Sequence, residues 1–358
     1  MRIARIAIYL GMAIYPAAGQ SRIEAEIHRV QQSLADRPIN DPNFAAVPGE
    51  IAIRSKSAAD AAAAGRFYFS LERLGQSLDM LNGARAGVDL VRTAGADLPS
   101  FEKEWNRTAA ELESFRKDFD KHNWAAAPAA VRALAEAAAT RTTPLLDGSR
   151  GFALSTKPAD GLYYLGQVRG QMEFARFSEG LDLARKGRAL PLRSFLPELQ
   201  ALQQKVNAAF QPPKSIDQHP LFISVNSVLK LANELDASRR YSGALYQYLE
   251  AVRMFQMMDA TPTAVDAQPA LIGKLESARA KLAASRQDDS IAQLFFERAL
   301  WQAKHPDGSP SSADEWRAAA AIAESILPAY EAALRPATVS RTAKGKTIDL
   351  TLVRWPYT

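Results

Sequence analysis

Residues 225–258 read VNSVLKLANELDASRRYSGALYQYLEAVRMFQMM, and this stretch decides the fold that we expect. Apolar and small side chains recur in it three or four residues apart, which places them on one face of a helix. The pattern occurs in both halves, so it predicts two helices joined by a turn. The residues at this spacing are Val228, Leu231, Ala232 and Leu235 in the first helix, and Tyr241, Ala244, Tyr248 and Ala251 in the second.

The same stretch resembles a single tetratricopeptide repeat, a helix–turn–helix unit of about 34 residues. Its alanines allow two helix backbones to approach closely, while the leucine and tyrosine side chains fill the space around them. Three positions depart from the family pattern, because Val228, Leu235 and Gln256 replace its tryptophan, tyrosine and proline. The flanking segments do not repeat the pattern at the same interval. The resemblance implies a stack of helical hairpins whose rigid face binds another protein or a peptide.

The rest of the chain has the same helical spacing, for example at Ile23, Ile27, Val30 and Leu34. Buried strands bounded by glycine do not recur between these segments, which argues against an α/β fold. We therefore expect an all-α protein of stacked antiparallel helical hairpins. The pattern leaves open whether the helices form an extended array or a closed bundle.

Proline and glycine clusters interrupt the helical pattern and suggest how the chain is divided. The strongest interruption is residues 141–160, which contain Pro144, Gly148, Gly151 and Pro158. We expect a helical region at 20–140, a linker at 141–160, a repeat-like helical region at 161–335 and a tail at 336–358.

Two short segments alternate with a period of two, which is typical of β-strands. Residues 50–54 place Ile51 and Ile53 on one face, and residues 346–355 do the same with Ile348, Leu350 and Leu352. Because an isolated strand is unstable, we predict that the two segments pair. The alternative is that residues 346–355 form an unpaired basic tail.

The N-terminus has the order of a secretory signal peptide at residues 1–19. Arg2 and Arg5 precede an uncharged apolar run, and small residues follow before Gln20. We predict export to the periplasm or the medium, with cleavage around Gly19–Gln20. An uncleaved membrane anchor and a buried N-terminal helix are the alternatives. No later stretch is long and apolar enough to suggest a membrane span.

The composition argues against several kinds of chemistry. The chain has no cysteine, so it has neither disulfides nor thiolate sites. Its four histidines, His28, His122, His219 and His305, lack the spacing of a metal site on one helix face. The formal charge of +5 is spread along the chain without a basic stripe, so we do not expect nucleic-acid binding. No phosphate-binding glycine loop or nucleophile elbow occurs, and we expect neither a cofactor nor catalysis.

Two segments resemble each other, GRFYFSLERLGQSLDML at 65–81 and GLYYLGQVRGQMEFARF at 161–177. Their paired aromatic residues, Phe67 and Tyr68, and Tyr163 and Tyr164, are the candidates for lining a ligand cavity. We expect the protein to be an exported scaffold that binds a protein or a peptide. A helical protein that binds a small molecule or a glycan in an aromatic cavity is the alternative. A hydrolase with dispersed carboxylates is a third hypothesis.

Overall fold

The computed structural model describes residues 18–94, 97–183, 185, 187–213, 215–259, 268–304 and 310–335. Over these ranges the protein is all-α, as the sequence predicts, with twelve helices packed antiparallel and no strand. The helices are α1 (Ala18–Asp36), α2 (Val47–Ala63), α3 (Phe67–Ala94), α4 (Leu98–Phe119), α5 (Ala129–Ser155), α6 (Pro158–Glu179), α7 (Leu196–Ala209), α8 (His219–Ala237), α9 (Tyr241–Asp259), α10 (Gln268–Ala283), α11 (Ser290–Lys304) and α12 (Pro310–Leu334).

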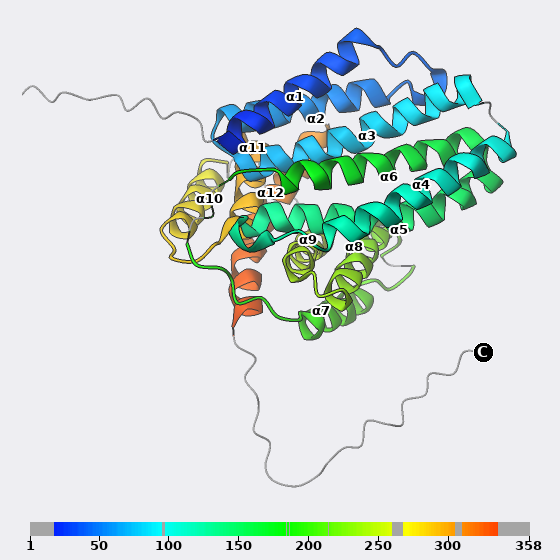
Figure 1. The fold of residues 1–358 in the computed structure, drawn as a ribbon. Helices are drawn as coiled ribbons and strands as arrows, with labels where there is room; N and C mark the ends of the chain where they lie inside the picture. The colour runs from blue at the N-terminus through cyan, green and yellow to red at the C-terminus, as the bar shows by residue number, and fades with distance from the viewer. Residues whose placement is uncertain are drawn as a thin grey trace, which may run out of the picture.

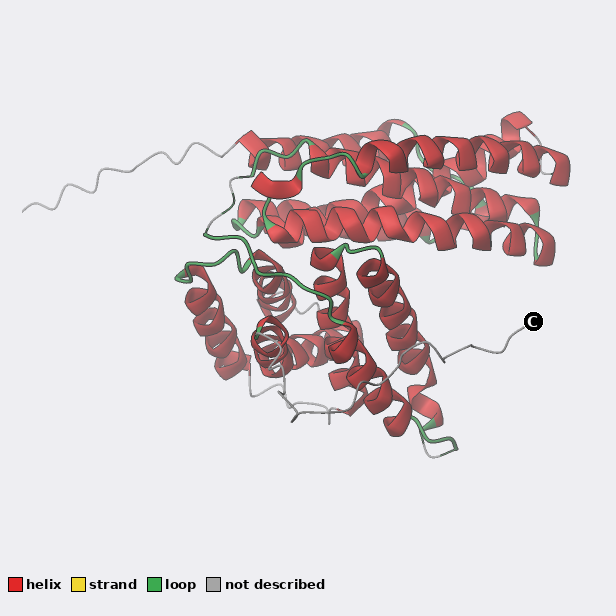
Figure 2. Ribbon diagram, turned by 60° about the horizontal axis from the view of Figure 1, so that its bottom comes forward, coloured by secondary structure: helices red, strands yellow, loops and turns green. Residues whose placement is uncertain are grey.

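The helices form two layers. Helices α1 to α6 lie side by side, and α7 to α12 cover one side of them and run mostly across them (Figure 1, Figure 2). The layers meet where α5 contacts α8 and α9, and where α11 contacts α3 and α5. A single cluster of buried apolar side chains extends through both layers. The two layers therefore share one apolar core.

The centre of the first layer is the close antiparallel packing of α3 against α6. A Cβ added at Gly166 would lie 2.6 Å from the Ala86 Cβ and 2.8 Å from the Gly83 Cα. A Cβ at Gly170 would lie 2.8 Å from the Leu78 carbonyl oxygen. The two similar segments of the sequence belong to these two helices, and Gly166 and Gly170 of the second segment allow the backbones to approach.

Four helix N-termini are capped by acidic side chains from distant parts of the chain. Glu297 accepts hydrogen bonds from the first turn of α3, and Asp288 accepts one from the N-terminal residue of α5 at 2.7 Å. Glu136 accepts one from the first turn of α9, and Asp236 accepts one from the residue before α7. Because the first backbone N–H groups of a helix lack helical partners, these carboxylates supply the missing acceptors.

The helical hairpin expected at 225–258 is present as α8 and α9. Its turn passes through Arg239, whose φ of 58° lies in the left-handed region. Ala232, Ala244 and Ala251 are all fully buried between the packed helices, as their spacing predicts.

The strand predicted at 50–54 is wrong, because these residues lie within α2. Ile51 is fully buried and Ile53 is 62% exposed, so the two side chains point to opposite sides of the helix. The proposed partner at 346–355 lies outside the described residues.

The segment 141–160, expected to be a linker, is mostly helical. Helix α5 continues through Pro144 to Ser155, and α6 begins at Pro158. A Cβ added at Gly148 or Gly151 would meet nothing within 4 Å, so both glycines lie on an open side of α5.

Residues 1–17 lie outside the described part of the chain, and α1 begins at Ala18, within the predicted signal segment. Among the helices that are described, none has the length and apolarity needed to span a membrane.

Candidate functional site

The aromatic residues singled out in the sequence pack against protein rather than around a common cavity. Tyr163 stacks on Phe44 with ring centroids 5.4 Å apart, and Tyr164 stacks on Phe152 at 4.2 Å. Burial raises the pKa of Tyr163 to about 12. These contacts join α6 to the η1 turn (Pro42–Phe44) and to α5. They account for both tyrosines as packing residues.

The other aromatic pair lies toward the opposite end of the first layer. Phe67 and Tyr68 begin α3, whereas Tyr163 contacts Gly83, roughly 20 Å further along that helix at 1.5 Å per residue. The backbone N–H of Tyr68 donates to Glu297, and burial raises the pKa of its phenol above the usual range. The two pairs therefore do not line one site.

The hairpin residues also serve mainly in packing. Tyr241 and Tyr248 are half-buried and contact the apolar core, and burial raises the pKa of Tyr248. Leu231 is an exception, because it is buried yet also lines a surface groove.

A groove between α5 and α8, the α5–α8 groove, has both charged and apolar walls. It consists of two adjoining parts of about 640 Å³ and 340 Å³, which share Pro144, Lys230 and Glu234. Helix α5 contributes Thr140, Arg141, Thr143, Pro144 and Asp147, helix α8 contributes Ser227, Val228, Lys230, Leu231 and Glu234, and the flanking elements contribute Arg116 and Arg240.

Two of the four cations in the groove are already held by neighbouring side chains. Arg116 donates to the Thr143 hydroxyl. Arg240 donates to the Thr140 hydroxyl at 2.9 Å and forms an ion pair with Asp120 at 2.8 Å. Asp120 therefore neutralises Arg240, whereas Thr143 holds Arg116 in place without neutralising it.

Arg141 and Lys230 differ from these two. Both are exposed, and neither makes a hydrogen bond or an ion pair within the described residues. They stand beside the apolar Val228 and Leu231 and the carboxylate of Glu234, so the middle of the groove offers two cations and one anion next to an apolar wall.

Pro144 adds a backbone acceptor to the same place. Proline has no N–H, so it cannot make the helical hydrogen bond to the carbonyl of Thr140, four residues earlier. Thr140 and Pro144 both line the groove. A bound backbone N–H group can supply the donor that this carbonyl lacks.

The strongest charge cluster lies between the layers and is saturated. The guanidinium of Arg298 donates to both oxygens of Glu72 and, at 2.7 Å, to Glu250. The phenol of Tyr246 also donates to Glu72, at 2.5 Å. Arg253 and Arg298 hold the pKa of Glu250 well below its usual range despite burial. Because their oxygens are occupied, these carboxylates hold the layers together and are poorly placed for proton transfer.

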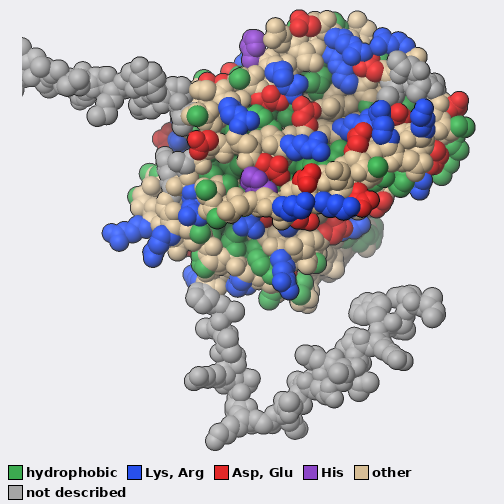
Figure 3. All heavy atoms as spheres, in the orientation of Figure 1, with side chains coloured by type: hydrophobic (Ala, Val, Ile, Leu, Met, Phe, Trp, Pro, Cys, Tyr) green, Lys and Arg blue, Asp and Glu red, His purple; other side chains and the backbone are tan. Residues whose placement is uncertain are grey.

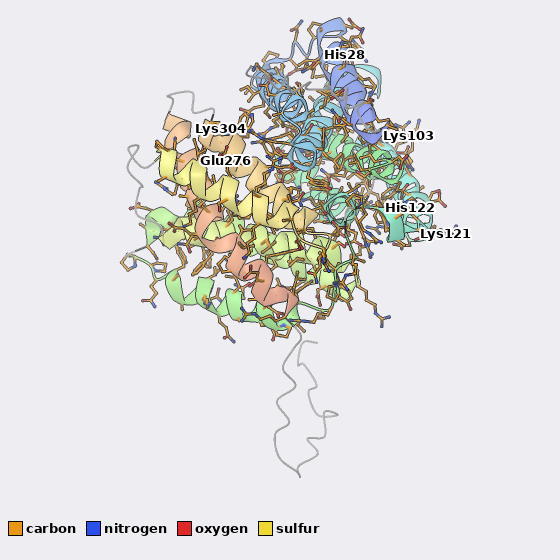
Figure 4. All side chains as sticks on the ribbon, turned by 90° about the vertical axis from the view of Figure 1, so that its left-hand side faces the viewer. His28, Lys103, Lys121, His122, Glu276 and Lys304 are labelled. Atoms are coloured by element: carbon orange, nitrogen blue, oxygen red, sulfur yellow. The ribbon has the colours of Figure 1, made fainter. Side chains whose placement is uncertain are left out.

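The described residues give no support to a metal site or a basic surface. No group of three or more potential ligands lies together in the ranges that the structure covers. His28 and His122 are well apart in Figure 4, and His122 contacts the edge of Trp124. The same figure shows Lys304 beside Glu276, with which it pairs at 2.6 Å. On the face shown in Figure 3, basic and acidic side chains alternate.

The sequence pointed to this region only in part. It singled out Leu231 in α8, but not Arg141 or Lys230, because exposed cations on a helix are ordinarily solvated. Pro144 was recognisable as a break in the helical pattern, but the pattern did not show that it lies inside a helix.

Comparison with known proteins adds no identification, since no family model, curated protein or solved structure matches the chain.

Proposed function

We propose that this protein is a noncatalytic helical scaffold that binds an extended, acidic polypeptide segment in the α5–α8 groove. The observation that carries the proposal is the pair of exposed cations, Arg141 and Lys230, next to the apolar side chains of Val228 and Leu231. A segment that alternates acidic and apolar residues meets both requirements. Its backbone also supplies a donor for the carbonyl of Thr140.

The signal-like residues 1–19 add a location to this proposal. We infer that the scaffold acts in the periplasm or outside the cell, where its partner would be another exported protein. This inference rests on the sequence of the N-terminus alone.

The alternative functions have less support. A glycan or small-molecule site built from Phe67, Tyr68, Tyr163 and Tyr164 requires a shared cavity, and these residues pack at different ends of the first layer. A carboxylate hydrolase requires a free acid and a free base facing one cleft. The buried carboxylates Glu72, Glu136 and Glu297 instead accept hydrogen bonds from protein groups.

The test is fluorescence anisotropy with a labelled peptide of alternating leucine and glutamate, compared with one of leucine and lysine. We expect the full chain to prefer the acidic peptide. The double variant Arg141→Ala/Lys230→Ala should weaken its binding at least tenfold, through the loss of two ion pairs in a partly desolvated groove.

The matched control is Lys56→Ala/Arg92→Ala, which also removes one lysine and one arginine. These side chains are 76% and 66% exposed and lie on α2 and α3, away from the groove. The control should bind the acidic peptide as the original protein does. Equal losses in both double variants would mean that the peptide responds to overall charge, and would overturn the groove proposal.

A further inference from the structure

A small polar cavity that is partly open to solvent lies between α3, α5, α6 and α9. Its volume is about 70 Å³, several times the 10–15 Å³ or so that one water molecule needs. The polar residues in its wall include Glu72, Gln76, Asp79, Arg141 and Gln171. Leu134 and Phe174 make part of the wall apolar.

Most of the polar groups in this wall already have partners. Glu72 is held by Arg298 and Tyr246. The side-chain oxygen of Gln76 accepts from Arg73 at 2.9 Å, and Asp79 Oδ2 accepts from Gln167 at 3.2 Å. These groups need nothing further from a ligand.

Asp79 Oδ1 differs from these groups. It is buried and has no hydrogen-bond partner within the described part of the chain. The amide of Gln171 lies near enough to lower the pKa of the carboxyl, but burial outweighs it and raises that pKa to about 6. A buried carboxylate oxygen without a donor is costly, so the site favours whatever supplies one.

We propose that this cavity binds a primary ammonium group, which donates a hydrogen bond to Asp79 Oδ1 and balances its charge. An ammonium ion, alone or with one or two carbon atoms, suits the volume, and the apolar wall accommodates the carbon atoms. A divalent cation fits less well, because Ca²⁺ takes six to eight oxygen ligands and Asp79 is the only wall carboxylate that is not already paired.

The charges around Asp79 determine how binding depends on pH. Helix α3 contributes Glu72 and Arg73, α5 contributes Arg141, α6 contributes Tyr163, α9 contributes Tyr246, and α11 contributes Arg298, which neutralises Glu72. Of these, Arg141 acts directly on Asp79 and lowers its pKa. The ammonium group requires the ionised carboxylate, so its binding strengthens as the pH rises through about 6.

The ammonium group has two possible sources. It can belong to a small free amine, or to a lysine side chain of a polypeptide that lies in the α5–α8 groove, since Arg141 lines both spaces. The free-amine case does not depend on the function proposed above. Loss of acidic-peptide binding therefore leaves this proposal intact.

The experiment measures binding of methylammonium to the full chain by calorimetry in an amine-free phosphate buffer. Tetramethylammonium, which has no N–H donor, is added at equal ionic strength as the comparison. We expect methylammonium to bind at least tenfold more tightly at pH 8 than at pH 5, because about a tenth of a group with a pKa near 6 is ionised at pH 5. Tetramethylammonium should not bind. Equal binding of both ions would overturn the proposal.

Two variants assign the effect to the cavity. Asp79→Asn keeps the shape of the side chain and removes its charge, and it should abolish methylammonium binding. The control Asp118→Asn changes a carboxylate that is 75% exposed on α4, and it should bind as the original protein does. Unchanged binding by Asp79→Asn would overturn the proposal. Because the two ions are compared in the unaltered protein, the test stands even if Asp79→Asn folds poorly.

A pair of peptides separates the two sources of the amine. They differ only in one lysine, which is acetylated in the second peptide. Displacement of methylammonium by the lysine peptide alone would assign the site to a polypeptide side chain. Displacement by neither peptide would assign it to a free amine.

Discussion

Glu136 and Glu297 show at the scale of single residues why buried charge is hard to infer from a sequence. Each accepts backbone hydrogen bonds at the first turn of a helix far away in the chain. Burial raises the pKa of both carboxyls, that of Glu297 to about 7. In the sequence both residues read as ordinary charged positions on helices, because the groups that they cap come from other elements.

Asp288 and Asp289 come directly before α11, where acidic side chains are favoured by the helix dipole. The structure gives each of them a distant partner as well. Asp288 accepts from the backbone of α5 at 2.7 Å, and Asp289 accepts from the Tyr330 hydroxyl at 2.8 Å. The acidic side chains of these two residues indicate the start of the helix that follows them. Their contacts with distant elements could not be predicted from residue spacing.

Asp79→Asn should increase stability at high pH and change it little at low pH. The pKa of Asp79 rises from 3.8 in the unfolded chain to about 6 in the folded protein. The free energy of unfolding is therefore highest below pH 3.8. It falls by roughly 3 kcal/mol in total as the pH rises through about 6. Asparagine does not titrate and avoids this loss.

The measurement is urea unfolding of both proteins at pH 4 and pH 8, in buffers without amines. The stability gain from Asp79→Asn should be larger at pH 8 by about 2.5 kcal/mol. Asp118→Asn provides the comparison, and its effect should be the same at both pH values within about 0.5 kcal/mol. A pH-independent effect of Asp79→Asn would show that this carboxyl titrates normally in the folded protein.

At the scale of elements, hydrophobic spacing predicted helices well and their ends poorly. The α8–α9 hairpin follows from alanines and leucines that repeat three and four apart. Ile51 and Ile53 misled the strand prediction, because two positions two apart fit a strand as well as the two sides of a helix. Helix α5 continues past both Pro144 and Gly148. The side chain of Pro144 is exposed, and Gly148 has free space around it, so neither position ends the helix.

The crossing of α3 and α6 depends on glycines that the sequence marked only as shared positions. Gly166→Ala should destabilise the protein by about 1–3 kcal/mol, because the added methyl meets the backbone of Gly83 and the Cβ of Ala86. The helices must then move apart or shift along each other. Thermal and urea unfolding would measure the loss.

Gly148→Ala is the control for this change. Gly148 is also a helical glycine, and a Cβ there meets nothing within 4 Å. Alanine should therefore be neutral or stabilise by up to about 1 kcal/mol, since it favours the helix more than glycine does. If Gly166→Ala were as stable as Gly148→Ala, the close approach of α3 and α6 would not be needed for the fold.

For the whole molecule, the all-α class was predictable and the layer arrangement was not. Helix spacing identifies which face of a helix is buried, but it does not say which other helix covers that face. Helix α9 lies between its hairpin partner α8, α5 of the first layer and α12. The resemblance to a tetratricopeptide repeat remains a prediction, and the candidate groove depends on α5 and α8, which are far apart in the sequence.

The two layers are joined by a polar contact that should contribute strongly to stability once formed. Arg298 of α11 pairs with Glu72 of α3, and Tyr246 of α9 donates to the same carboxylate. Arg298→Met should lower the free energy of unfolding by about 3–5 kcal/mol, because it leaves Glu72 and Glu250 buried without their cation.

Glu72→Gln combined with Arg298→Met should cost less than the sum of the single changes. The interaction energy from this double-mutant cycle, measured by urea unfolding, should exceed 1 kcal/mol or so. The exposed pair Glu113 and Lys117, changed in the same way, should give about 0.5 kcal/mol or less. Equal coupling in the two cycles would mean that the contact between layers is carried by apolar packing alone.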